Sequence, residues 1–203
     1  MISGYILAGG LSRRMGRNKA LLSLDGKTFI ERSHEAVAAI ATNVWLVGYT
    51  GPEDPRLPII PDISDTVEKR GSIVGLVSAL RHCPDEMAAV AACDLPFISA
   101  ALMTRIADIA NADKCAECVV PIQPDGEAQP LCAIYRKDKM LPIAEAALHD
   151  GAWRLRQLIE NAEVRLVRFS EIEDLPGSSN FFFNVNDASE FEKARRISNS
   201  DEA

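Results

Sequence analysis

The chain is 203 residues long, with a hydrophobic fraction of 47% and a formal net charge of −7 at neutral pH. The acidic balance argues against a nucleic-acid partner, because proteins that bind the phosphate backbone carry a clear basic surplus. The most apolar run, residues 87–103, is interrupted by Asp94 and Pro96, so we also expect no bilayer-spanning segment and no membrane partner.

The cysteines indicate the cellular compartment. Five cysteines form an odd and irregular set, which is more typical of buried cytoplasmic thiols than of a disulfide framework. Cys115 and Cys118 form one C-x-x-C, but a zinc site needs a second pair or histidines at ligand spacing. We therefore expect a cytoplasmic protein in which this pair has no zinc or redox role.

Strand-like apolar runs alternate with helical patterns along the chain. We expect, in chain order, a strand at 5–8, a helix at 28–41, strands at 44–47 and 59–60, a helix at 73–80, a strand at 89–92 and a helix at 100–110. Strands at 118–122 and 131–135, helices at 139–148 and 153–160, strands at 164–167 and 181–185 and a helix at 188–196 follow. The polar tail 198–203 is expected to be frayed.

This alternation predicts the fold class. A strand, a helix and a further strand in turn give a largely parallel sheet covered by helices on both faces. We therefore expect a three-layer α/β/α, Rossmann-like architecture in a single domain spanning residues 1–203.

The segment LAGGLSRRMGRNK, residues 7–19, follows the first expected strand. It begins with the Gly9–Gly10 pair, and it contains four cations before the first acid, Asp25. Glycines at a strand end let backbone amides approach a phosphate, although they are also common in ordinary turns. The spacing fits neither the P-loop nor the dinucleotide G-x-G-x-x-G fingerprint. A plain turn has no use for the cations Arg13, Arg14, Arg17 and Lys19, so we interpret the segment as a phosphate loop.

The same segment resembles the L-A-G/A-G-x-S-x-R-M-G-x-x-K signature of sugar-phosphate and cofactor nucleotidyltransferases. Its LAGG form is similar to the molybdenum cofactor guanylyltransferases, which attach GMP to molybdopterin. The resemblance extends over about residues 4–196 through IIPD (59–62), RGSIVGLVSAL (70–80), AACDLPFIS (91–99), QPLCAIY (129–135) and FFNVND (182–187). It implies a nucleotidyltransferase fold, GTP and molybdopterin as substrates, and proteins that deliver and receive the cofactor as partners.

Nucleotidyl transfer explains the basic loop. Two anions must approach each other while charge builds on the leaving pyrophosphate, so the enzyme has to position them and screen that charge. We expect backbone amides of Ala8 to Leu11 to cradle the phosphates, and the resemblance implies GTP contacts at Leu7, Ala8, Gly9 and Gly10. It also implies catalytic roles for Arg14 and Lys19 on the β- and γ-phosphates, whereas Arg13 and Arg17 are equally well explained as surface charges.

Asp94 is the predicted magnesium ligand and a catalytic residue that contacts GTP. It follows a buried strand at its carboxyl end, where a carboxylate either faces the ligand crevice or is a costly buried charge. Magnesium takes one or two carboxylates together with phosphate oxygens and water. A capping role for Asp94 is less suitable, because Ser99 is better placed to cap the next helix.

Two asparagines near the end of the chain are candidates for an acceptor or second metal contact. Asn184 and Asn186 lie two residues apart in FFNVND. The alternative is that Asn186 and Asp187 only cap the last helix, and the sequence leaves both interpretations open.

The resemblance implies that Asp62 contacts guanine or ribose, although by itself it would be an ordinary loop acid. Val47 and Gly71 are further expected GTP contacts, with Gly71 letting a helix pack beneath the nucleotide. Two departures bear on them: Gly71-Ser72-Ile73 stands where the family shows Gly-Pro-Leu, and Val47 or its neighbours stand where an asparagine often holds guanine or ribose. Gly75 fits either a close helix beneath the nucleotide or simple helix packing.

The combined interpretation is a magnesium-dependent guanylyltransferase that transfers GMP from GTP to molybdopterin. The alternatives are a cytidylyltransferase for molybdopterin or for a sugar or polyol phosphate, and a non-catalytic nucleotide-binding regulator. Lys19 and Asp94 together disfavour the regulator, because a mere binder does not need the metal carboxylate. The missing G-x-G-x-x-G disfavours an NAD(P)-binding protein.

Overall fold

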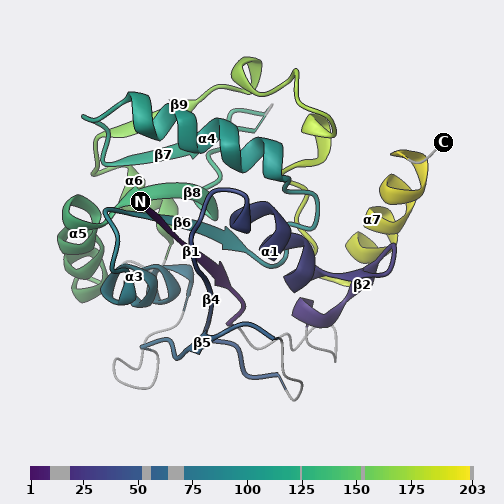
Figure 1. The fold of residues 1–203 in the computed structure, drawn as a ribbon, viewed down its shortest axis with the longest axis horizontal. Coiled ribbons are helices and arrows are strands. Elements are labelled where there is room, and N and C mark those ends of the chain that lie inside the picture. The colour runs from purple at the N-terminus through teal and green to yellow at the C-terminus, as the bar shows by residue number, and fades with distance from the viewer. Residues whose placement is uncertain (10–18, 52–55, 64–70, 124, 152–153, 202–203) are drawn as a thin grey trace.

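The chain forms one seven-stranded sheet with helices on both faces (Figure 1). The structure is a computed structural model that describes residues 1–9, 19–51, 56–63, 71–123, 125–151 and 154–201. No helix within these ranges is long and apolar enough to cross a membrane.

The sheet has the order β5-β4-β1-β6-β8-β7-β9. All neighbouring strands pair in parallel except those next to β8, which is antiparallel to both β6 and β7. The expected mostly parallel sheet is therefore confirmed. The strands are β1 (Ile2–Leu7), β4 (Val44–Val47), β5 (Ile59–Ile60), β6 (Met87–Ala92), β7 (Cys118–Pro121), β8 (Cys132–Arg136) and β9 (Val164–Val167).

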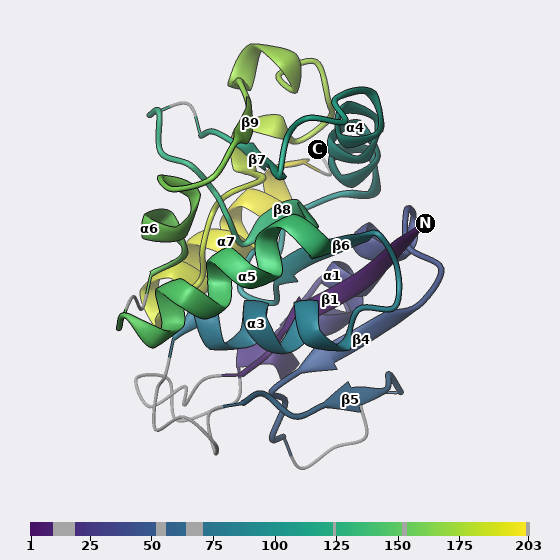
Figure 2. The same cartoon turned by 90° about the vertical axis from the view of Figure 1, so that its left-hand side faces the viewer.

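Helices cover the sheet on both faces, as a three-layer fold requires. One face packs on α1 (Phe29–Ala38) and α4 (Ala100–Ala112), and the other on α3 (Ser72–His82), α5 (Lys137–His149) and α6 (Leu155–Ile159). Figure 2 shows α3 and α5 in front of the strands and α1 behind them. The side chains of β1 alternate accordingly: Ile2 and Ile6 join the α1 and α4 face, and Tyr5 joins the other.

The helix starts carry the expected capping residues. The Thr28 hydroxyl accepts from Glu31 N, and the Glu31 carboxylate accepts from Thr28 N, which forms a capping box on α1. These bonds hold the pKa of Glu31 below its usual value. Ser99 caps α4 by accepting from Leu102 N at 3.2 Å, so the preference for Ser99 over Asp94 as the cap is confirmed.

A small hairpin after the basic loop was not among the expected elements. β2 (Ser23–Leu24) pairs with β3 (Lys27–Thr28) around Asp25 and Gly26, both with positive φ. Such a pair favours the tight two-residue turns that join antiparallel strands. The hairpin contacts the last helix, α7 (Ala188–Asp201), which lies beside β2 in Figure 1.

One expectation for the C-terminal region is wrong. Residues 181–185 are not a strand: they follow a 3-10 turn (Ser178–Asn180), and Phe181 and Phe182 fill the core beside α4. An apolar run indicates that its side chains are buried, but it does not fix the secondary structure. Here the buried phenylalanines come from a loop. Helix α7 continues to Asp201, and the buried Ser198 donates its hydroxyl to Asp25. The frayed tail at 198–203 stays a prediction.

Candidate active site

The carboxyl ends of four parallel strands meet at one edge of the sheet. Ala8 N donates to Val47 O at 3.0 Å, Gly48 N donates to Ile60 O at 3.0 Å, and Cys93 N donates to Leu7 O at 3.2 Å. Parallel sheets bind ligands at this edge. The residues predicted from β1, β4, β5 and β6 are therefore brought to the same side of the molecule.

Two glycines and Asp62 are in close contact at this edge. Gly48 has a φ of +68°, and a Cβ there would lie 2.6 Å from Asp62 Oδ2. A Cβ on Gly9 would lie 3.1 Å from the same oxygen and 3.2 Å from Gly48 O. The Asp62 carboxylate therefore occupies space at the ends of β1 and β4 that a side chain at Gly9 or Gly48 would fill. Both positions require a residue without a side chain.

The hydrophobic residues predicted to contact GTP point into the core. Val47 is buried on the α3 face and Ala8 on the α1 face, while the Leu7 side chain packs on α3. At Val47 and Ala8 only the backbone is left to meet a ligand, whereas the Leu7 side chain is partly exposed. The hypothesis that Val47 takes over a base or ribose contact therefore does not extend to its side chain.

The two glycines of α3 have different surroundings. Gly71 is the exposed residue before the helix, with a φ of +125°, a conformation that favours glycine. A Cβ on Gly75 would lie 3.2 Å from Leu7 Cδ2, so this glycine lets α3 approach β1 closely. The packing interpretation of Gly75 is therefore supported by a direct contact.

Asp94 follows β6 and carries a carboxylate in a buried position. Burial raises its pKa above the usual value, and the nearby Lys19 ammonium opposes that rise. Among the described residues, Asp94 Oδ1 is buried without a hydrogen-bond partner. Asn184 Oδ1 is buried and unpartnered in the same sense. Buried polar atoms are normally hydrogen-bonded, so both oxygens are available to a ligand.

The C-terminal segment reaches back to this edge. Val185 N donates to Asp94 O at 2.9 Å, and Lys19 Nζ donates to Asn186 Oδ1 at 3.1 Å. Lys19 opens a 3-10 turn (Lys19–Leu21) directly after the basic loop. The structure thus brings Lys19, Asp94 and Asn186 together from three distant parts of the sequence.

Helix capping and the Asn186 side chain are separate features. Glu190 N donates to Asp187 Oδ1 at 2.9 Å, and Asp187 N donates to Glu190 Oε2 at 3.2 Å, which is a capping box. Asp187 is therefore the capping residue, while the Asn186 side chain binds Lys19. The backbone N of Asn186 also donates to Glu190 Oε2, at 2.5 Å. Glu190 was not among the expected site residues, although the D-x-x-E spacing is a capping signal.

The rest of the basic loop lies outside the described residues. This applies to Gly10 and Arg14 among the predicted site residues, and to Arg13 and Arg17. Their roles stay predictions.

The oxygen donors at this edge fit a magnesium ion. Within the described ranges no three His, Cys, Asp or Glu side chains cluster as a metal site of their own. Magnesium does not need such a cluster, because it takes one or two protein oxygens together with substrate phosphates and water. A carboxylate oxygen and an amide oxygen that are both buried and unpartnered, from Asp94 and Asn184, suit that chemistry.

The two cysteines of C-x-x-C differ in their surroundings. Cys115 is exposed, whereas Cys118 is buried in β7, where burial raises its pKa to about 12. A buried thiol of high pKa is inert at neutral pH. The absence of a zinc or redox role for this pair stays a prediction.

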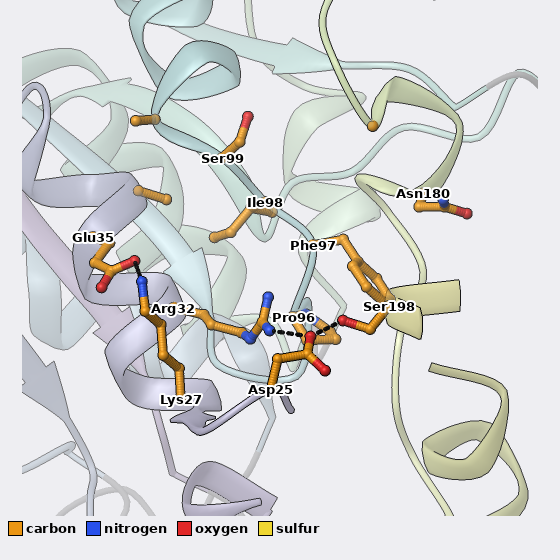
Figure 3. Close-up of a pocket in the computed structure, with 13 residues that line it drawn as sticks. Asp25, Lys27, Arg32, Glu35, Pro96, Phe97, Ile98, Ser99, Asn180 and Ser198 are labelled. Carbon is orange, nitrogen blue, oxygen red and sulfur yellow. Dashed lines mark hydrogen bonds and ion pairs between the residues drawn. The ribbon is translucent and has the colours of Figure 1, made fainter. Parts of the chain in front are cut away.

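A cavity of about 540 Å³ lies away from these residues (Figure 3). Its walls come from α1, the β2–β3 hairpin, residues 96–100, the turn at Gly177 and Asn180, and Ser198 of α7. The Arg32 guanidinium donates to Asp25, which also accepts from the Ser198 hydroxyl. None of the predicted site residues that the structure describes lines it, so the candidate site rests on the strand edge.

Comparison with known proteins gives the family. The MobA-like NTP transferase domain matches residues 4–166. A molybdenum cofactor guanylyltransferase from Desulfosudis oleivorans is 34% identical over 194 residues, which cover 95% of this chain and 94% of that protein. A probable molybdenum cofactor guanylyltransferase from Bacillus cytotoxicus is 30% identical over 197 residues, which cover 94% of each.

A solved structure has the same fold. The crystal structure of molybdopterin-guanine dinucleotide biosynthesis protein A from Archaeoglobus fulgidus matches with a TM-score of 0.76 at 24% identity, over 98% of this chain and 100% of that chain. The fold class expected from the sequence is thereby confirmed. The domain match and the relatives agree over nearly the whole chain, so it belongs to the molybdenum cofactor guanylyltransferase family and is a nucleotidyltransferase with a MobA-like NTP transferase domain.

Proposed function

We propose that the protein transfers GMP from GTP to the phosphate of molybdopterin in a magnesium-dependent reaction in the cytoplasm. A phosphate oxygen of molybdopterin attacks the α-phosphorus of GTP and forms a new P–O bond. The bond from the α-phosphorus to the bridging oxygen breaks, and pyrophosphate leaves. The names of the relatives from D. oleivorans and B. cytotoxicus support this acceptor and this base. We expect proteins that deliver and receive the cofactor as partners.

The observation that carries the proposal is the meeting of Lys19 and Asp94 at the carboxyl edge of the sheet. Lys19 binds Asn186, the residue after Val185, and Val185 N donates to Asp94 O. The Lys19 charge also acts on the Asp94 carboxyl, and Cys93, next to Asp94, donates to Leu7 O at the end of β1. A cation and a carboxylate in this position match the needs of a triphosphate and of the metal that accompanies it.

Lys19 would bind the leaving pyrophosphate. Negative charge builds on that group as the α-phosphorus bond breaks, so an ammonium is more stabilising in the transition state than in the bound substrate. Asn186 fixes the direction of this ammonium by accepting one of its hydrogens. Backbone amides at Ala8 and Gly9 would orient the phosphates beside it.

Asp94, together with Asn184, would hold the magnesium ion. When bound, magnesium neutralises phosphate charge and aligns the phosphate oxygens for displacement. The protein contributes buried oxygens that no described residue satisfies. Bound nucleotide and metal would then relieve the cost of keeping the Asp94 carboxylate in a buried position.

Asp62 is the proposed guanine contact. Guanine presents N1–H and N2–H₂ as donors, and a carboxylate can accept from both. The carboxylate lies between the ends of β1 and β4, where Gly9 and Gly48 leave room for it. Cytosine lacks this pair of donors, so the site would discriminate against CTP.

A coupled pyrophosphate assay tests the proposal. Purified protein, molybdopterin and Mg²⁺ are incubated with each of the four nucleoside triphosphates in turn. We expect pyrophosphate release with GTP that depends on both molybdopterin and Mg²⁺ and is lost in Asp94→Asn. Release with CTP at the same rate would move the assignment to a cytidylyltransferase. Release with none of the four would support a nucleotide-binding regulator.

A further inference from the structure

Glu190 contacts the segment that holds Lys19. Its Oε2 accepts from Asn186 N at 2.5 Å and from Asp187 N at 3.2 Å, at the first turn of α7. The side chain of the same Asn186 accepts from Lys19 at 3.1 Å. Glu190 Oε2 therefore holds the backbone of Asn186, and the side chain of Asn186 in turn holds the Lys19 ammonium.

The position of Glu190 also places it beside the metal-binding end of β6. Glu190 binds the backbone of Asn186, and Asn186 directly follows Val185 in the chain. Val185 N donates to Asp94 O at 2.9 Å. The chain from 184 to 190 is thus tied to the site at Asp94, at Lys19 and at its own helix start.

We propose that Glu190 is a positioning residue for nucleotidyl transfer, which holds Asn186 so that its side chain directs the Lys19 ammonium toward the triphosphate. The inference rests on the proposed function, because it assigns Lys19 to the leaving pyrophosphate. Glu190 itself touches neither substrate nor metal in this role. It acts through Asn186.

Capping alone does not account for these contacts. A capping box needs the bond between Glu190 and the capping residue, here Asp187, and Glu190 makes that bond at 3.2 Å. The shorter bond goes to Asn186 N, one residue before the cap, and it is not part of the box. The two roles are therefore separable by mutation.

Four variants separate the roles. Glu190→Ala removes both contacts, and Glu190→Gln keeps an oxygen that can accept from Asn186 N. Asp187→Ala removes the cap oxygen and leaves the Glu190 side chain in place. Glu192→Ala is the matched control on the same helix, because Glu192 is exposed and forms an ion pair with Arg195.

Hydrogen exchange measures the positioning directly and needs no catalysis. The Asn186 amide should lose protection in Glu190→Ala and keep most of it in Glu190→Gln and Glu192→Ala. Unchanged protection at Asn186 in Glu190→Ala would overturn the inference, whatever substrate the enzyme uses. An inactive wild-type protein would instead refute the proposed function, so the two failures are distinguishable.

Kinetics test the link to Lys19. We expect Glu190→Ala to lower kcat for pyrophosphate release by about tenfold with less than about a threefold change in the KM for GTP, because a misdirected ammonium matters most as charge develops. Glu190→Gln should restore most of kcat, and Asp187→Ala and Glu192→Ala should stay near wild type. In a Lys19→Ala background, Glu190→Ala should change kcat by less than about twofold. A full tenfold loss in that background would show that Glu190 does not act through Lys19.

Discussion

The Lys19 ammonium donates a hydrogen bond of 3.1 Å to the side-chain oxygen of Asn186, across 167 positions of sequence. This bond joins the end of the basic loop to the segment before the last helix. It makes the C-terminal region part of the site, because Asn186 lies directly before the α7 cap. The first prediction follows from it.

Asn186→Ala should slow transfer by removing one acceptor of the Lys19 ammonium. We expect kcat to fall by about tenfold or more, the scale of one lost oriented group, with a smaller effect on GTP affinity. Stopped-flow pyrophosphate release measures it, and Asn199→Ala on the exposed side of α7 is the control. Equal rates for the two variants would remove Asn186 from the catalytic arrangement.

Lys19→Ala should weaken GTP binding and slow transfer together. The ammonium contributes to triphosphate binding and contributes more as the pyrophosphate leaves. Isothermal titration and single-turnover kinetics give the two quantities. If affinity and rate both stay within about twofold, roughly 0.4 kcal/mol, the assignment of Lys19 to the phosphates is wrong.

Asp94→Asn should abolish turnover and yet raise the stability of the fold at neutral pH. Burial raises the folded-state pKa of Asp94, so the protonated form is favoured in the fold and the ionised form costs stability. This cost is absent below the unfolded-state pKa, grows as pH rises from that value to the folded-state pKa, and is constant above it. The advantage of the variant should therefore shrink as pH falls.

Urea unfolding at several pH values measures this difference. Adding Mg²⁺ with GTP should stabilise wild type more than Asp94→Asn, because the variant lacks the charged ligand. A loss of about 3 kcal/mol or more in transition-state stabilisation is expected for the missing group. Near-normal turnover would contradict the metal assignment.

Gly48→Ala should weaken GTP binding by displacing Asp62. The new Cβ would lie 2.6 Å from Asp62 Oδ2, and the residue would keep a φ of +68°. Gly26→Ala is a matched control, since it has a φ of +78° and no atom within 4 Å of the new Cβ. Both variants should lose about 1 kcal/mol of stability from the left-handed backbone. Only Gly48→Ala should lose GTP affinity in a titration, and equal affinities would separate Asp62 from the nucleotide.

Cys115→Ser combined with Cys118→Ser should leave the specific activity unchanged. Cys118 is buried, so its hydroxyl replacement should cost about 1–3 kcal/mol of stability unless it finds a partner. Denaturant unfolding and zinc analysis of the purified protein are the measurements. Stoichiometric zinc in wild type that is absent from the double variant would give the C-x-x-C pair a metal role.

The part of the site at the carboxyl edge of the sheet could be predicted from local sequence patterns. Asp94 comes directly after a buried apolar run, and a parallel sheet gathers such strand ends on one side. Strand alternation also fixes which side chains face the helices, so the inward orientation of Val47 could have been inferred from its register in β4.

The contacts between distant segments could not be predicted in this way. The Lys19–Asn186 bond depends on how residues 181–187 fold over the sheet, and an apolar run cannot distinguish a strand from a buried loop. The hairpin at Asp25 and Gly26 has only two residues in each strand, too few for a period-2 pattern. Its Asp-Gly pair is the one signal that the sequence offered.

The most direct measurement of the central claim is the mass of the product formed in a mixture of all four nucleoside triphosphates at equal concentration. The protein is incubated with molybdopterin and Mg²⁺, and the pterin products are analysed by mass spectrometry. We predict molybdopterin carrying GMP in at least about tenfold excess over every other adduct, because one unsatisfied buried acceptor costs about 1–3 kcal/mol. A product carrying CMP in equal or greater amount, or no adduct at all, would contradict the account.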